Sequence, residues 1–186
     1  MLQRNDYMYG LINEAIKRMV IDTFDQEKWV EVSREAEIKE TRFQPFEQYD
    51  DEITAKLVSV ISEKISMEAP LLLEKFGEYW VNYAKDSEYS SILNTFATSP
   101  VELIKSLDSL HTRLEITFQQ LKAPSFYVTT VSDKEILVHY STERELPLKY
   151  FVVGLIKGIF NMFEQTCRVN IIEPKNNETA VFKVVF

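Results

Sequence analysis

The sequence contains two histidines, and one of them falls on an apolar face. After Ser99-Pro100, which reads as an N-cap followed by a first-turn proline, apolar residues recur at helical spacing: Ile104, Leu107, Leu114, Phe118 and Leu121. His111 lies between Leu107 and Leu114 on the same inward face. A neutral imidazole in an apolar setting can ligate a haem iron, although a hydrogen-bonded core histidine is the commoner case. His139 alternates away from the apolar side of its strand, so we expect it to be exposed.

A phenol, a hydroxyl and a guanidinium alternate in Tyr140-Ser141-Thr142-Glu143-Arg144, at the end of a predicted strand. Side chains two residues apart share a strand face, so Tyr140, Thr142 and Arg144 should lie on the side of Ile136 and Val138. A guanidinium binds carboxylates in a bidentate manner, and the two hydroxyls beside it could hold a second carboxylate. The group suits a ligand with paired carboxylates, such as the propionates of haem. The alternative is an ordinary edge strand whose arginine leaves the sheet into solvent.

Gly154 and Gly158 stand four residues apart in an apolar segment that also contains Phe151, Leu155 and Ile159. Glycine inside a helix costs about 1 kcal/mol relative to alanine, so two on one face indicate that something approaches closely. Either a flat ligand or a second helix backbone would explain the pair.

The spacing of apolar residues changes near Pro124 from a helical repeat to a strand repeat, so different elements are expected on either side of it. Before it, apolar residues recur every three or four positions, which predicts helices near 10–20, 25–36, 50–65, 69–84 and 100–121. After it, the alternation of apolar residues predicts four strands, over Phe126–Val131, Ile136–Thr142, Val169–Ile172 and Val181–Phe186. One helix, over about Leu148–Gln165, is predicted between the second and third strands. The predicted fold class is α+β, with a helical N-terminal part followed by a four-stranded antiparallel sheet with one inserted helix.

The net charge, the cysteine count and the missing motifs exclude several classes of function. The 186 residues carry a formal charge of -8, which opposes the phosphate neutralisation that nucleic-acid binding needs. The single cysteine, Cys167, can form neither an internal disulfide nor a thiolate zinc cluster, and no apolar run is long enough to span a bilayer. Phosphate-loop, dinucleotide, nucleophile-elbow and zinc-protease signatures are all missing. We therefore expect a cytoplasmic, globular, non-enzymatic protein without a nucleic-acid or membrane partner.

Five stretches of the sequence together resemble the haem nitric oxide/oxygen binding (H-NOX) family, the sensor domain shared by bacterial gas sensors and animal soluble guanylate cyclase. They are Met8-Tyr9-Gly10-Leu11-Ile12-Asn13, Phe76-Gly77-Glu78-Tyr79-Trp80, Leu107-Asp108-Ser109-Leu110-His111, Ala123-Pro124-Ser125-Phe126 and His139-Tyr140-Ser141-Thr142-Glu143-Arg144. The resemblance spans nearly the whole chain. It implies a single domain, 1–186, with a helical subdomain over about 8–66 and a haem-ligating part over about 67–186.

The resemblance implies a role for each matching residue around haem b, which is iron protoporphyrin IX. His111 would be the proximal iron ligand, and Tyr140, Thr142 and Arg144 would grip the propionates. One departure is that the family's Tyr-x-Ser-x-Arg appears here as Tyr-x-Thr-x-Arg. The additional methyl group stiffens the side chain at χ1, so the propionate geometry should shift slightly.

The resemblance also assigns the surroundings of the porphyrin. Pro124 matches a proline that presses on and bends the macrocycle, and Ile12 and Leu155 match residues that pack against it. Oxygen-binding members carry a distal tyrosine where this chain has Phe151, whose ring offers no hydroxyl. Trp80 matches a distal position where an indole N–H could donate weakly.

By resemblance the chain is a bacterial sensor of NO and CO that excludes O2. Binding of NO opposite His111 would break the bond from iron to His111 and shift the helix that carries it. The signal would pass to a separate protein, which in bacterial relatives is commonly a histidine kinase or a cyclic-di-nucleotide enzyme. Two alternatives are an O2-binding member that uses Trp80 or a tyrosine as distal donor, and a haem-free module of the vinyl reductase (V4R) type. An enzyme that uses a histidine base is disfavoured because no nucleophile is partnered with one.

Overall fold

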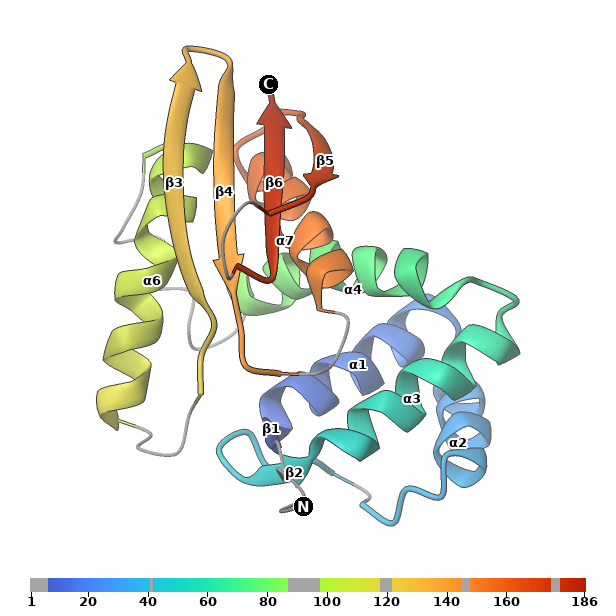
Figure 1. Cartoon of the computed structure of the whole chain (residues 1–186). Helices are drawn as coiled ribbons and strands as arrows, with labels where there is room; N and C mark the ends of the chain where they lie inside the picture. The colour runs from blue at the N-terminus through green and yellow to red at the C-terminus, as the bar shows by residue number, and fades with distance from the viewer. Residues whose placement is uncertain (1–6, 41, 87–97, 118–121, 145–147, 175–177) are drawn as a thin grey trace. The chain divides into compact units, whose positions relative to one another are not determined.

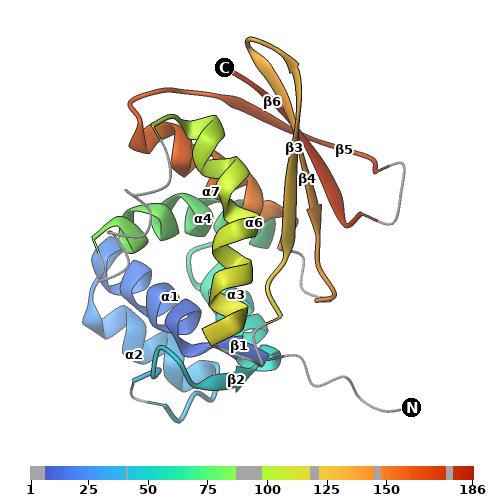
Figure 2. The same cartoon turned by 90° about the vertical axis from the view of Figure 1, so that its left-hand side faces the viewer.

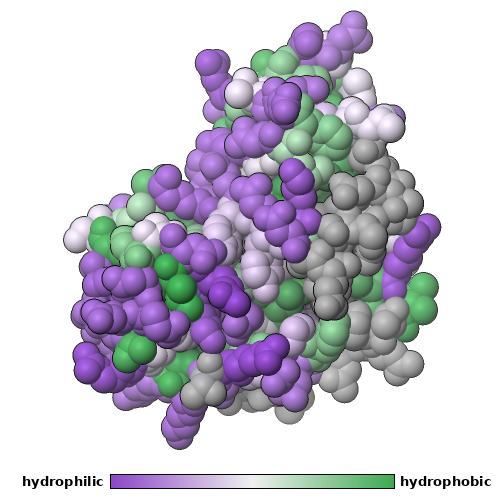
Figure 3. All heavy atoms as spheres, turned by 180° about the vertical axis from the view of Figure 1, so that it is seen from behind, coloured by the Kyte–Doolittle hydropathy of each residue, from purple (hydrophilic) through white to green (hydrophobic). Residues whose placement is uncertain are grey.

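The computed structural model describes residues 7–40, 42–86, 98–117, 122–144, 148–174 and 178–186. The chain divides into two compact units, Met1–Phe76 and Gly77–Phe186, and helix α4 (Ala69–Lys85) spans the boundary. Hydrophilic side chains dominate the face shown in Figure 3, with hydrophobic ones in patches between them. Within the described ranges, every helix is too short or too polar to cross a membrane.

Helices and a small two-stranded sheet make up the described part of the first unit (Figure 1). The helices are α1 (Gly10–Thr23), α2 (Gln26–Glu35) and α3 (Asp51–Lys64), as the apolar periodicity predicts. Strands β1 (Tyr7–Tyr9) and β2 (Gln48–Asp50) pair in an antiparallel manner, and neither was predicted from the sequence. Strands of three residues are too short for alternation to stand out from chance.

A four-stranded antiparallel sheet in the order β3-β4-β6-β5 forms the frame of the second unit. The strands are β3 (Ser125–Ser132), β4 (Glu135–Ser141), β5 (Arg168–Ile172) and β6 (Ala180–Val185). Helices α6 (Pro100–Thr117) and α7 (Lys149–Met162) lie on the same face of this sheet, as Figure 2 shows. The predicted order of two strands, one helix and two strands is confirmed.

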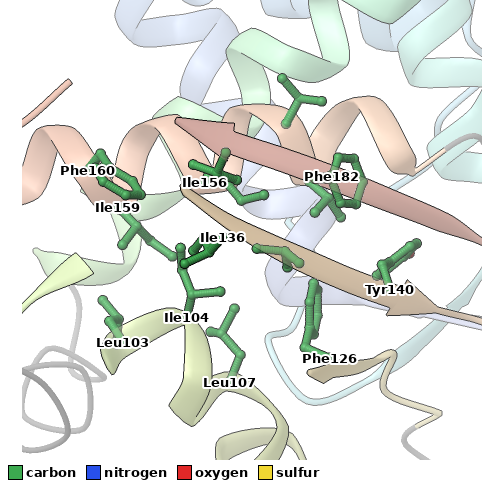
Figure 4. Close-up of a cluster of buried hydrophobic side chains, with 14 of the residues drawn as sticks. Leu103, Ile104, Leu107, Phe126, Ile136, Tyr140, Ile156, Ile159, Phe160 and Phe182 are labelled. Carbon is green, nitrogen blue, oxygen red and sulfur yellow. The ribbon is translucent and has the colours of Figure 1, made fainter. Parts of the chain in front are cut away.

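The core of the second unit lies between this sheet and its helices. Side chains from α6, α7 and the strands meet there, as Figure 4 shows for Ile104, Ile156 and Phe182. Along β4, alternate residues are buried, with Ile136 and Tyr140 each 1% exposed. The predicted inward face of β4 is therefore confirmed, and it brings Tyr140 into the core.

The start of α6 follows the predicted cap. Ser99 Oγ accepts a hydrogen bond from the N–H of Glu102 at 3.3 Å, and Pro100 occupies the first helical position. The predicted end of this helix at Leu121 lies outside the described residues, which break off after Thr117.

The end of α7 differs from the prediction. The helix stops at Met162 and not at Gln165, because Glu164 adopts a left-handed conformation with φ 57°. The N–H of Gln165 then bonds to the carbonyl of Phe160 at 3.0 Å, which closes the helix. A left-handed glutamate is uncommon, so this stop could not be predicted from the residue types.

Candidate functional site

His111 lies on α6, and its partly buried ring faces the segment that leads into β3. Its Nδ1 is 3.0 Å from the carbonyl oxygen of Pro124. Because a carbonyl can only accept a hydrogen bond, Nδ1 carries the proton and Nε2 is left for another partner. Histidines that ligate metals have this arrangement, in which one ring nitrogen donates to a carbonyl and the other meets the metal.

Burial keeps this imidazole neutral. It lowers the pKa of His111, and the hydrogen bond to Pro124 and the carboxylates of Asp108 and Glu115 oppose that shift without reversing it. Since an unperturbed histidine has a pKa of about 6.5, His111 is uncharged at neutral pH. Its Nε2 therefore has a lone pair available at the pH of a cell.

Three side chains of α6 bond to the backbone of residues 123–126, where the chain enters β3. Besides the His111 bond, Glu115 Oε1 accepts from the N–H of Ala123 and Asp108 Oδ1 accepts from the N–H of Phe126, each at 3.1 Å. Neither Asp108 nor Glu115 was predicted from the sequence to have a role at this site. Asp108 lies three residues before His111 and Glu115 four residues after it, so all three side chains share one helix face. This spacing could have indicated that they contact the same segment of the chain.

Tyr140, Thr142 and Arg144 come together at the end of β4. Thr142 forms a side-chain hydrogen bond with Tyr140, and the charge of Arg144 acts on the same phenol. Thr142 Oγ1 also accepts from the backbone N–H of Arg144 at 3.2 Å. Burial raises the pKa of Tyr140 to about 12, so the phenol stays neutral and keeps its proton. Thr142 and Arg144 follow the last strand residue, Ser141, so a turn and not the sheet ladder positions them.

A row of rings connects His111 to this turn. Phe126 lies between them, with its centroid 5.7 Å from that of His111 and 5.2 Å from that of Tyr140. Phe182 continues the row at 6.3 Å from Tyr140. The imidazole and the phenol are therefore held by the same packed core within the second unit.

The other predicted contacts of the porphyrin lie on several helices. Phe151 and Leu155 are partly buried on α7 and pack against the core of the second unit. Trp80 lies on α4, with its ring centroid 5.9 Å from that of Tyr83. Ile12 lies on α1 in the first unit and is partly buried there.

Close packing against α4 accounts for Gly158 of α7. A Cβ added at Gly77 on α4 would lie 2.1 Å from the carbonyl oxygen of Phe151 and 2.9 Å from the carbonyl carbon of Gly154. A Cβ added at Gly158 would lie 2.9 Å from Val81 Cγ2. The two helices therefore cross with their backbones in contact, which only glycine allows.

His139 is not exposed, contrary to the expectation. Its ring stacks on Tyr127 at a centroid distance of 4.0 Å, and only 14% of its side-chain surface is accessible. Its Nδ1 lies 3.0 Å from Glu178 Oε1, and its Nε2 lies 3.2 Å from Thr129 Oγ1. Strand alternation places His139 on the outer face correctly, but Glu178, which precedes β6, folds over that face and covers it.

Side chains that could ligate a metal ion do not cluster in the described part of the chain. Within the described ranges, no group of three or more His, Cys, Asp and Glu side chains could hold an ion. Burial raises the pKa of the Cys167 thiol to about 11, so it stays protonated and is a poor ligand. One neutral imidazole suits an iron that brings its own macrocyclic ligands, as a haem iron does.

The model of the family described as Haem-NO-binding matches residues 9–171. The chain belongs to this family, known as H-NOX. Haem binding is the family's property, and the neutral imidazole of His111 and the phenol, hydroxyl and guanidinium at the end of β4 are groups that fit a haem.

Several curated relatives of this H-NOX domain are guanylate cyclases. Soluble guanylate cyclase gcy-33 of Caenorhabditis elegans is 21% identical over 96% of this chain and 19% of its own length. Guanylate cyclase soluble subunit beta-2 of Rattus norvegicus is 37% identical over 58% of this chain and 16% of its own. The chain thus spans about a fifth of the length of these relatives, and the match does not include the rest of either protein.

Solved structures show the same fold. An H-NOX protein from S. oneidensis in its Fe(II)NO ligation state aligns with a TM-score of 0.83 and 15% identity, over 95% of this chain and 98% of that one. The unliganded Fe(II) H-NOX protein from K. algicida aligns with a TM-score of 0.77 and 20% identity, over 96% of this chain and 95% of that one. The predicted H-NOX fold, with N-terminal helices followed by a four-stranded antiparallel sheet and an inserted helix, is confirmed.

Proposed function

We propose that this H-NOX domain is a haem-based gas sensor in which His111 ligates a ferrous haem b. The domain binds NO and CO and signals to a separate protein by a change of conformation. The observation that carries the proposal is the hydrogen bond from His111 Nδ1 to the Pro124 carbonyl, in a setting that keeps the ring neutral. That bond leaves Nε2 as the nitrogen for the iron.

The turn after β4 would bind the propionates. Arg144 supplies a guanidinium for a bidentate pair, and the hydroxyls of Tyr140 and Thr142 supply neutral donors that keep their protons. Pro124, Ile12 and Leu155 would give the porphyrin apolar surface. Haem, when bound, supplies the ferrous iron that takes a diatomic gas.

The three bonds between α6 and the segment that leads into β3 would carry the signal. A displacement of His111 acts on that segment through its own bond and through those of Asp108 and Glu115 on the same helix face. The helix and the start of the strand therefore move together. The free energy available for signalling is limited to the difference in gas affinity between the two conformations. The recipient would be a separate signalling protein such as a histidine kinase or a cyclic-di-nucleotide enzyme.

An absorption spectrum tests the proposal directly. Haem-loaded protein is reduced with dithionite, desalted and exposed separately to air and to NO. We expect a ferrous spectrum that air leaves unchanged and NO alters, because Phe151 gives no hydroxyl to stabilise polar bound O2. A stable oxy spectrum would mean that Trp80 or a tyrosine supplies a distal donor. Protein without a Soret band would be the haem-free module instead.

Phe151→Tyr should introduce O2 binding. A phenol at the predicted distal position adds one donor, and a hydrogen bond to a polar or charged acceptor contributes about 1.5–3 kcal/mol, which corresponds to a gain of roughly tenfold to a hundredfold in affinity. The measurement is an O2 titration of the reduced protein followed by absorbance. Phe151→Leu is the matched control, since it changes the ring without adding a donor. Equal O2 affinity in the two variants would remove residue 151 from the distal pocket.

A further inference from the structure

The turn that presents Thr142 and Arg144 lies beyond the hydrogen-bonded ladder of the sheet. Strand β4 ends at Ser141, and its last register pair with β6 is Tyr140 with Ala180. Thr142 therefore has no strand neighbour to satisfy its backbone N–H and carbonyl. Another part of the chain must hold this turn if its side chains are to keep one arrangement.

Thr179, the residue just before β6, holds the turn. Its backbone N–H donates to the Tyr140 carbonyl at 2.9 Å, which extends the ladder by one bond. Its Oγ1 accepts from the N–H of Thr142 at 3.0 Å and lies 3.3 Å from the Thr142 carbonyl, to which its hydroxyl donates. One hydroxyl thus satisfies both backbone groups of Thr142, across 37 positions of sequence.

The bonds of Thr179 also determine how the side chains of Tyr140, Thr142 and Arg144 are placed. With its backbone fixed, Thr142 places its own Oγ1 to accept from the N–H of Arg144 and to bond with Tyr140. Thr179 is held in turn through its neighbour Glu178. Glu178 accepts a hydrogen bond from Tyr127 Oη at 3.1 Å and lies 3.0 Å from His139 Nδ1. Thr179 is exposed, so its hydrogen bonds and not its burial define its role.

We propose that Thr179 is a positioning residue for the carboxylates of the ligand: its hydroxyl fixes the turn so that Tyr140, Thr142 and Arg144 meet the two propionates together. The proposal rests on the haem-binding function proposed above. Thr179 does not touch the ligand in this account and acts only through Thr142.

The test compares Thr179→Val, which keeps the shape and loses the hydroxyl, with Thr179→Ser, which keeps the hydroxyl. Release of haem from the reduced 186-residue protein to excess apomyoglobin is followed by absorbance. We expect Thr179→Val to release haem roughly tenfold faster, since it removes both hydrogen bonds that hold the backbone of Thr142. Thr179→Ser should stay within about twofold of wild type. Thr130→Val is the matched control, because it makes the same change at another exposed threonine of the same sheet.

Haem dimethyl ester, which has no free carboxylates, separates positioning from a general weakening of the fold. With this probe the difference between Thr179→Val and wild type should disappear, whereas a structural defect would accelerate release of either probe. The effect of Thr179→Val should likewise disappear in an Arg144→Ala background, because the two changes act on one contact. Equal haem release by Thr179→Val and wild type, or an equal effect with the ester, would overturn the proposal. Failure of the wild-type protein to bind haem would instead refute the function on which it rests.

Discussion

We expect His111→Gly to lose haem and to recover it when imidazole is supplied in solution. His111 has one nitrogen available for a metal, since the other is bonded to the carbonyl of Pro124. Removal of even a supporting partner of a metal ligand lowers affinity roughly 10–100-fold, so removal of the ligand itself should lower it by about 100-fold or more. The glycine also leaves a space into which free imidazole can enter. Haem content after desalting, with and without millimolar imidazole, is the measurement.

Two controls isolate the imidazole. Thr112→Gly introduces a glycine at the next position of α6, where the side chain is exposed, and carries the same helix penalty of about 1 kcal/mol. His139→Ala removes the other histidine of the chain. Both variants should keep wild-type haem content. A His111→Gly protein that retained haem and its spectrum without imidazole would show that another residue ligates the iron.

Local periodicity was enough to predict most of the second unit. The apolar spacing of Ile104 and Leu107 defines the inward face of α6, and both side chains are buried in the structure. Alternation along β4 likewise predicts that Tyr140 points into the core, where it is 1% exposed. These predictions succeed because burial on one face imposes a fixed repeat on a regular element, and the repeat is visible in the sequence itself.

Contacts that join distant segments could not be predicted in this way. Thr179 bonds to Thr142 across 37 positions, and nothing in the local sequence distinguishes Thr179 from other exposed threonines. The pairing of Glu178 with His139 reverses the predicted exposure of that histidine for the same reason. Residues near strand ends obey no repeat, because turns and not a sheet ladder determine where their side chains go. The residue types of the turn after β4 could therefore be predicted from the sequence. The bonds from Thr179 that position the turn could not.

Gly77→Ala should destabilise the second unit strongly. The added methyl group would lie 2.1 Å from the carbonyl oxygen of Phe151 and 2.6 Å from the backbone nitrogen of Leu155. Backbone atoms of a packed helix cannot turn aside as a side chain can, so α4 and α7 would have to separate. Overpacking typically costs 1–3 kcal/mol, and a clash with backbone on this scale should lower the free energy of unfolding by about 3 kcal/mol.

Gly158→Ala provides the comparison, because it adds the same methyl group to the same pair of helices. There the nearest atom is Val81 Cγ2 at 2.9 Å, the end of a side chain that can shift. Alanine also regains about 1 kcal/mol of helix propensity, so we expect a net loss of about 1 kcal/mol or less. Urea unfolding of the haem-free proteins, followed by circular dichroism, measures both changes without a contribution from ligand binding. If Gly77→Ala unfolded at the same urea concentration as Gly158→Ala, the backbone contact between α4 and α7 would be wrong, and with it the placement of Phe151 opposite Gly77.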